Sequence, residues 1–116
     1  MIPKTFKLLG HTITVVVDNE KTEKEDCFGM FDDKQNIIYV ATKYKRGKRW
    51  FSYSDDTVEH TFYHELVHAI LFNMGEMKLY SNERFVDAFG GMLQQYMSTK
   101  NEDLDYKRKP RSRNPK

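Results

Sequence analysis

Two histidines separated by three residues, with a glutamate directly after the first, stand in the sequence His64-Glu65-Leu66-Val67-His68. In a helix, residues four apart lie on one face, about 6 Å apart along the axis, so both imidazoles can bind one metal ion. Glu65 then lies beside the ion without binding it, and can accept a proton from an activated water. Zinc takes nitrogen and carboxylate ligands and leaves one position open for catalysis. The pattern therefore predicts one Zn²⁺ per chain and hydrolytic chemistry.

The residues around this motif have the signals of a helix from about 57 to 74. Asp56 is the expected N-cap, with Glu59 three residues later, and Asn73 and Gly75 supply a C-terminal stop. Apolar residues occupy two sides of this helix, so we expect it to be buried between a sheet and a second helix.

A catalytic zinc site requires a third protein ligand. The chain has four histidines, and none follows the motif: His11, His60, His64 and His68. His60 lies one turn before His64, too far along the helix to join the same tetrahedron. Of the downstream carboxylates, Glu76 lies in the turn after the helix, whereas Glu83 begins a second predicted helix over 82–98, with Ser81 as its expected N-cap. An antiparallel second helix would direct Glu83 back to the motif, so Glu83 is the favoured third ligand.

The second predicted helix has two different faces. Its broad apolar face, which we expect to be core, contains Phe85, Val86, Phe89, Met92, Leu93, Tyr96 and Met97. A narrow second stripe contains Glu83, Asp87, Gly90 and Gln94. Glycine in a helix interior costs roughly 1 kcal/mol relative to alanine, so Gly90 and Gly91 indicate a close approach to the motif helix.

Two hairpins are predicted before the motif. The segments 4–9 and 12–18 flank a turn at Gly10-His11, and the segments 27–31 and 36–41 flank a turn at 32–35. Within the second hairpin, Gly29 indicates a bulge or a close backbone approach.

The remaining segments are expected to be less regular. Residues 19–26 are interpreted as a charged turn, 43–48 as a basic loop, and 49–53 as a short strand or ordered loop. These elements predict an α+β fold in which a short, mostly antiparallel sheet of three to five strands packs on the motif helix and on a second, glutamate-bearing helix.

Length and charge support one domain with a separate tail. A chain of 116 residues is expected to form a single domain, here 1–98. The overall net charge is +2, yet the segment 107–116 has six basic residues and no acid, so residues 1–106 carry −4. The tail, 99–116, is charged and contains proline, and we expect it to be disordered.

Other features restrict the class of protein. A single cysteine, Cys27, cannot form an internal disulfide and supplies no zinc–thiolate cluster. No apolar run approaches the roughly 20 residues of a membrane span, and the first ten residues do not resemble a signal peptide. These features predict a cytoplasmic protein that does not enter a membrane.

Residues 82–90, with the sequence NERFVDAFG, resemble the ligand helix of the gluzincins, the thermolysin-like zinc metallopeptidases, whose pattern is N-E-x-x-x-D-x-F-G. The resemblance implies that Glu83 binds zinc together with His64 and His68. It also implies that Asp87 hydrogen-bonds the non-ligating nitrogen of His64, which fixes the tautomer of that ring.

The resemblance covers only about residues 56–97, and the chain has no room for the second domain of thermolysin-like enzymes. In size and layout the chain is more similar to the small ImmA/IrrE-type and phage-encoded zincins, which place a short sheet before the motif helix. A phage origin would place the protein in the host cytoplasm. The resemblance therefore implies a small zincin-like fold.

These family features imply a metalloendopeptidase that hydrolyses peptide bonds in a protein or peptide substrate, with Glu65 as general base. A second oxyanion donor is usual, and the candidates are Tyr80, which we prefer, and Tyr63, His60 and Arg84. In zincins the substrate pairs with an edge strand, and here the expected strand is 37–41, with Ile37, Tyr39 and Ala41 as substrate contacts. The same residues also fit a plain amphipathic strand.

The principal alternative is a zinc-containing nucleic-acid-binding or regulatory protein. The basic tail, 107–116, motivates it, because clustered cations displace counterions from phosphates. The tail contains no aromatic residues between its last six cations, which disfavours binding of single strands. The two functions are compatible, since the tail can bring a peptidase to a DNA-bound substrate.

Overall fold

The computed structural model describes residues 1–107 as an α+β domain. Four strands form one sheet: β1 (Thr5–Leu8), β2 (His11–Val16), β3 (Gly29–Asp32) and β4 (Ile37–Val40). Two strands form a separate hairpin: β5 (Lys43–Arg46) and β6 (Arg49–Ser52). The helices are α1 (Asn19–Lys24), α2 (Asp55–Met74), α3 (Met77–Tyr80) and α4 (Glu83–Thr99). The α+β class is confirmed.

The main sheet has the strand order β1-β2-β4-β3. Both predicted hairpins are present as antiparallel pairs, β1 with β2 and β3 with β4, and a parallel pairing of β2 with β4 joins them. The mostly antiparallel sheet is therefore confirmed. The expectation of an edge strand at 37–41 is wrong, because β4 lies inside the sheet with partners on both sides. The edges of this sheet are β1 and β3.

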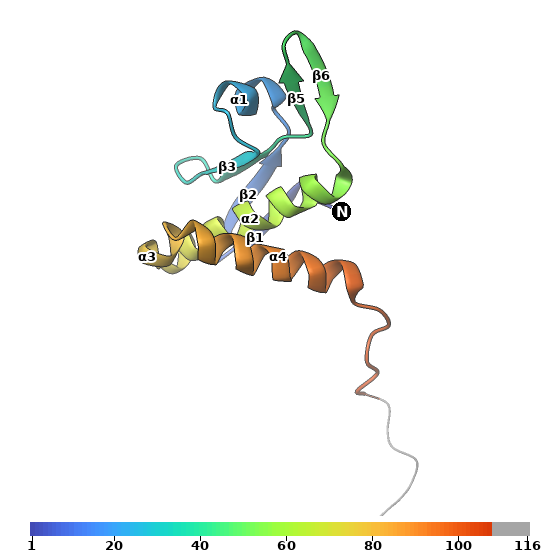
Figure 1. Ribbon diagram of the computed structural model, residues 1–116. Coiled ribbons are helices and arrows are strands. Elements are labelled where there is room, and N and C mark those ends of the chain that lie inside the picture. Colours follow the sequence, from blue (N-terminus) through green and yellow to red (C-terminus); the bar gives the residue numbers. More distant parts are fainter. Residues whose placement is uncertain (108–116) are drawn as a thin grey trace, which may run out of the picture.

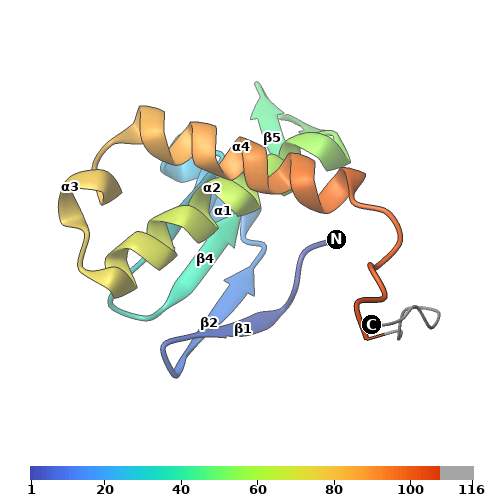
Figure 2. The ribbon, with the colours of Figure 1, turned by 90° about the horizontal axis from the view of Figure 1, so that it is seen from below.

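Helix α2 is the middle layer of the domain. It lies between the sheet and α4, as the two perpendicular views show (Figures 1 and 2). Buried side chains on one side of α2 join the sheet in the main core, which contains Ile13, Ile38, Val40, Phe62, Tyr63 and Ala69. On the other side, Val67 and Leu71 pack with Val86 of α4. The predicted burial of this helix on two sides is confirmed.

The ends of α2 are set by local hydrogen bonds. Ser54 is the N-cap, since its hydroxyl accepts from the backbone N–H of Thr57 at 3.1 Å. The expected cap, Asp56, lies inside the first turn, where its charge favours the helix N-terminus. At the other end Gly75 adopts the left-handed conformation at φ 76°, as the predicted stop requires.

Helix α4 runs antiparallel to α2 at very close range. A Cβ on Gly90 would lie 3.0 Å from the backbone nitrogen of His64, so the glycine permits this approach and the prediction is confirmed. At Gly91 the nearest atom, Cε1 of His60, would be 3.6 Å away, so only the first glycine is required. The N-cap is Asn82, whose side chain accepts from the N–H of Phe85 at 3.0 Å, and Ser81 is the residue before it.

The broad apolar face of α4 is only partly core. Val86 is fully buried and Leu93 packs against both clusters. Four other members of that face are exposed: Phe89, Met92, Tyr96 and Met97. The prediction that this whole face is core is wrong for these four, because α4 is an outer layer that contacts α2 along a narrow line.

Two segments are more regular than expected. Residues 19–24 form the short helix α1, with Asp18 as its N-cap, instead of a turn. The predicted basic loop at 43–48 contains strand β5, which pairs with β6 around Gly47. No helix in residues 1–107 is long and apolar enough to cross a membrane. After α4, residues 100–107 form neither helix nor strand, and the rest of the predicted disordered tail lies outside the described residues.

Candidate metal centre

Three side chains from two helices converge at one point. His64 and His68 come from α2, and Glu83 comes from the first turn of α4. One carboxylate oxygen of Glu83 lies 2.9 Å from Nε2 of His64, and the other lies 3.1 Å from Nε2 of His68. Each residue offers one ligand atom, and these three atoms lie within 4.8 Å of one another. The arrangement can hold a metal ion.

The distance from each imidazole nitrogen to its nearer Glu83 oxygen is close to the ligand spacing around a tetrahedral ion. Bonds of about 2.0–2.2 Å place the ligand atoms of a tetrahedral zinc roughly 3.4 Å apart. The Nε2-to-carboxylate distances are slightly shorter, so a small outward movement of Glu83 admits an ion. Glu83 has this freedom because its side chain is 68% exposed, whereas the two imidazoles are largely buried.

The second nitrogen of His64 supports a metal at the first. Nδ1 of His64 lies 3.1 Å from Oδ1 of Asp87, while Nε2 faces Glu83. A neutral imidazole donates from only one nitrogen, so it cannot satisfy both carboxylates with hydrogen bonds. A cation at Nε2 removes this conflict, because Nδ1–H then donates to Asp87 and Nε2 is free to coordinate.

His68 is the more deeply buried ligand candidate. Its Nδ1 is buried and makes no hydrogen bond of standard geometry within residues 1–107, although the backbone of Tyr80 favours the charged form of this imidazole. Burial has the larger effect and lowers the pKa of His68 below its usual value. The neutral ring, which is the form that binds metals, is thereby favoured.

Glu65 lies against this cluster but does not belong to it. Its side chain is buried, with only 7% of the residue exposed, and it lines the same cleft as the three ligand candidates. Burial raises the pKa of Glu65 to about 7, with nearby His64 opposing the shift and Glu83 adding to it. A carboxyl group with this pKa can both accept and release a proton near neutral pH.

The cleft around the cluster has a volume of about 980 Å³. Its walls are the segment from Cys27 to Phe31, one side of α2, and four residues of α3, α4 and the turn between them: Tyr80, Ser81, Glu83 and Asp87. Gly29 lets β3 approach α2, because a Cβ there would lie 2.6 Å from a methyl carbon of Thr61 and from the carbonyl oxygen of Tyr39. This is the close backbone approach that the glycine predicted.

The positions of the candidate oxyanion donors show which of them can reach the cleft. Tyr80 lines the cleft, and its ring lies 4.9 Å from that of His68. Burial raises the pKa of Tyr80, which keeps its hydroxyl protonated and able to donate. Tyr63 is buried in the core, and Arg84 is exposed outside the cleft lining.

His60 also lines the cleft, but its imidazole is already engaged. Its Nε2 lies 2.9 Å from the same Asp87 oxygen that faces His64, and its Nδ1 lies 3.1 Å from Oε1 of Gln94. The amide nitrogen of Gln94 donates to the carbonyl of Asp56. The stripe of Asp87, Gly90 and Gln94 on α4 is therefore the surface that faces the motif helix.

The contact of Asp87 with His64 was expected from the resemblance, but the parts of His60 and Gln94 in this network were not predicted from the sequence. The signal available was spacing, since His60 and His64 are one turn apart on α2 and Asp87 and Gln94 are two turns apart on α4. These spacings predict that the two stripes face each other only once the helices are known to be antiparallel. The expected substrate contacts Ile37, Tyr39 and Ala41 are absent from the cleft lining, in keeping with the interior position of β4.

A scan against models of protein families and searches of curated proteins and of solved structures found no match for this chain. The resemblance to the gluzincins therefore depends on the motif residues and their positions alone.

Proposed function

We propose that this protein is a zinc-dependent metallopeptidase with a minimal gluzincin site in a zincin-like fold. The observation that carries the proposal is the position of Glu65, which is buried beside the His64, His68 and Glu83 cluster and faces the same cleft. A purely structural zinc site is closed by four protein ligands and needs no buried acid beside it. Within residues 1–107 there are three ligand candidates and, beside them, one buried acid that is not a ligand.

In this proposal the ion is held by His64, His68 and Glu83. When bound, zinc supplies Lewis-acid activation of a water molecule and of the substrate carbonyl. Glu65 accepts the proton of the attacking water and passes it to the leaving amine as the peptide bond breaks. Asp87 holds the ring of His64 in its ligating tautomer, and Tyr80 donates a hydrogen bond to the developing oxyanion.

The free edge of β3 is the best place for an extended substrate. The N–H of Ala41 donates to the carbonyl of Phe28 at 2.8 Å, and antiparallel pairs alternate, so Met30 also bonds to β4. The backbone groups of Gly29 and Phe31 then face the open edge, and both residues line the cleft. A peptide that pairs with this edge passes alongside Glu65.

The first experiment measures zinc content and peptide cleavage in the wild type and two variants. The wild type is expected to hold one zinc per chain and to cleave denatured casein or a peptide library. Glu83→Ala is expected to lose zinc, and Glu65→Gln to retain it and lose cleavage. Full zinc occupancy in Glu83→Ala would mean that the third ligand lies elsewhere. Unchanged cleavage in zinc-loaded Glu65→Gln would refute the assignment of the base.

A further inference from the structure

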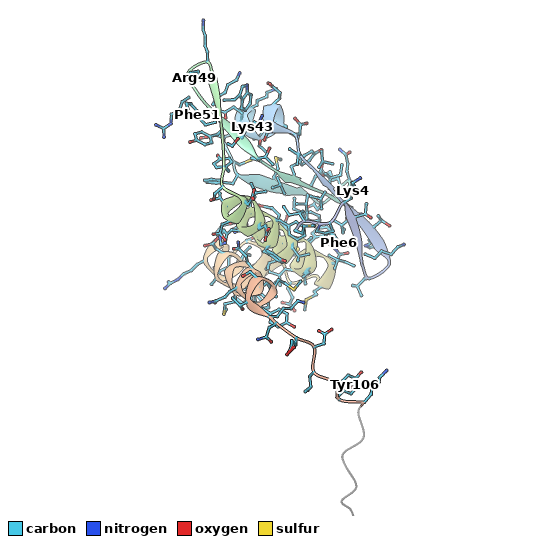
Figure 3. The ribbon with its side chains drawn as sticks, turned by 90° about the vertical axis from the view of Figure 1, so that its right-hand side faces the viewer. Lys4, Phe6, Lys43, Arg49, Phe51 and Tyr106 are labelled. Atoms are coloured by element: carbon cyan, nitrogen blue, oxygen red, sulfur yellow. The ribbon has the colours of Figure 1, made fainter. Side chains whose placement is uncertain are left out.

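The β5–β6 hairpin is the most strongly basic structured part of the described chain. It carries five cations and no acid between residues 43 and 53, and all five are exposed: Lys43, Lys45, Arg46, Lys48 and Arg49. None of the ion pairs found within residues 1–107 includes them. The hairpin extends away from the body, with Arg49 near its far end and Lys43 near the domain (Figure 3). These charges therefore have no ion-pair partner in this part of the chain.

Aromatic contacts hold the hairpin in one shape. Tyr44 stacks on Phe51 at 5.8 Å between ring centroids, and it also contacts Tyr53 at 4.7 Å. Tyr53 in turn contacts Phe28, which lies on the cleft wall, at 5.2 Å. On the other face, the ammonium group of Lys45 lies 5.0 Å from the ring centre of Trp50. A two-stranded hairpin is marginal by itself, and these contacts stabilise it.

The cross-strand register distributes the cations over both faces. Tyr44 pairs with Phe51 and Arg46 with Arg49, so the arginines share the face of the stacked aromatic rings. Lys43 and Lys45 lie on the opposite face, because neighbouring strand residues point to opposite sides. A ribbon with cations on both faces and at its tip fits between two rows of negative charge.

The major groove of duplex DNA has this form. It admits a two-stranded β-ribbon, and phosphates line both of its edges. Single strands bind to free aromatic platforms, whereas here the rings of Phe51 and Trp50 are covered by Arg49 and Lys45. The major groove of A-form RNA is too narrow for side chains to enter. We propose that the β5–β6 hairpin inserts into the major groove of duplex DNA, where its cations bind the phosphate backbone.

The surroundings of the hairpin direct DNA to its tip. Helix α1 packs beside β5 and carries acids, and one of them, Glu23, accepts a hydrogen bond from the backbone of Lys45 at 2.9 Å. The body of the chain is also acidic, so phosphates are repelled from it and attracted to the segment from Arg46 to Arg49. Because Phe28 joins the hairpin to the cleft wall, a protein bound on the same DNA would lie near the cleft. That consequence rests on the proposed function, whereas DNA binding does not.

The test uses the full chain and a fluorescein-labelled random-sequence duplex, with binding followed by anisotropy at several salt concentrations. The tip variant is Arg46→Gln/Lys48→Gln/Arg49→Gln. Each phosphate contact contributes a slope of about −0.9 to log K against log[salt], so the slope is expected to fall in magnitude by about 2–3. The affinity is expected to fall on the order of a hundredfold at about 0.1 M salt. Circular dichroism verifies that the variant is folded.

Two control variants separate the hairpin from the other cations. The first removes three exposed lysines on other elements, Lys7→Gln/Lys34→Gln/Lys78→Gln, and keeps the same net charge as the tip variant. It is expected to lose at most a fewfold in affinity. The second replaces the six cations of 107–116 with glutamine. It is expected still to bind the duplex, and its slope of log K against log[salt] is expected to keep the contribution of about 2–3 from the tip.

Three results would overturn the proposal. The first is a tip variant that binds the duplex as tightly as the wild type. The second is complete loss of binding in the tail variant with an intact hairpin. The third is wild-type binding to single-stranded DNA or to polyglutamate as tight as binding to the duplex, since that would identify a general anion site or a site for acidic proteins.

Discussion

Replacing the proposed general base should stabilise the metal-free protein. Burial raises the pKa of Glu65 to about 7 from an ordinary value of 4.5. Because the folded state binds this proton more tightly than the unfolded state, the folded state loses stability as the pH rises from 4.5 to 7. The cost is absent below pH 4.5 and complete above pH 7. At 1.36 kcal/mol per pKa unit it reaches about 3 kcal/mol.

Glu65→Gln removes the ionisation and keeps the shape of the side chain. In a chelator such as EDTA at pH 8, its free energy of unfolding should exceed that of the wild type by up to about 3 kcal/mol, which corresponds to about 10 °C in Tm for a domain of this size. The difference should shrink as the pH falls and vanish near pH 4.5. Urea titrations at four pH values between 4.5 and 8 measure it directly, because effects of other groups cancel in the comparison.

The matched control is Glu76→Gln, the same change at an exposed carboxyl in the turn after α2. It should alter stability little at any pH. A stability difference between Glu65→Gln and wild type that does not change with pH, or that favours the wild type at pH 8, would refute the reasoning. The carboxyl would then be solvated in the folded state, and its position beside the metal cluster would not destabilise the fold.

Three further predictions test the geometry around the cluster. Gly90→Ala should lower the free energy of unfolding in urea by roughly 1–3 kcal/mol, because its Cβ would press on the backbone of His64. Gly91→Ala should raise it by roughly 0.5–1 kcal/mol, and equal effects of the two variants would contradict the close approach. Asp87→Asn should weaken zinc about 10–100-fold in a chelator competition, and unchanged affinity would show that Asp87 does not support the ligand ring. Ser54→Ala should cost about 1 kcal/mol by loss of the cap of α2, and no loss in thermal unfolding would exclude the cap.

Local sequence patterns could not predict which strands lie at the edges of the sheet. The strands themselves were predictable, because β-branched runs and turn residues have a period of two that is visible in the sequence. Their order was not, since the parallel pairing of β2 with β4 joins residues far apart in the chain. That pairing buries β4 and leaves β3 at the edge beside the cleft. Any substrate contact inferred from strand order therefore required the tertiary structure.

Strand β5 of the hairpin was not predicted, because its segment is highly charged. Lys43 to Lys48 reads as a basic loop, because strand signals are weak where lysine and arginine alternate with aromatic residues. The strand is stable because Tyr44 packs on Phe51 and Tyr53, and those contacts form only after the chain reverses at Gly47.

By itself, the sequence determined the metal-ligand candidates. Helical spacing places His64 and His68 on one face of a helix and Glu65 next to them, and this is a property of the helix alone. The glycine at 90 also indicated the close helix pair, because its cost in a helix requires a packing reason.

Only the tertiary structure decided how the two helices meet. The antiparallel packing of α2 and α4 brings Glu83 to the histidines and places Asp87 between His60 and His64. It also buries Glu65 enough to raise its pKa. Burial and convergence depend on residues that lie far apart in the chain, and no local pattern of spacing contains them.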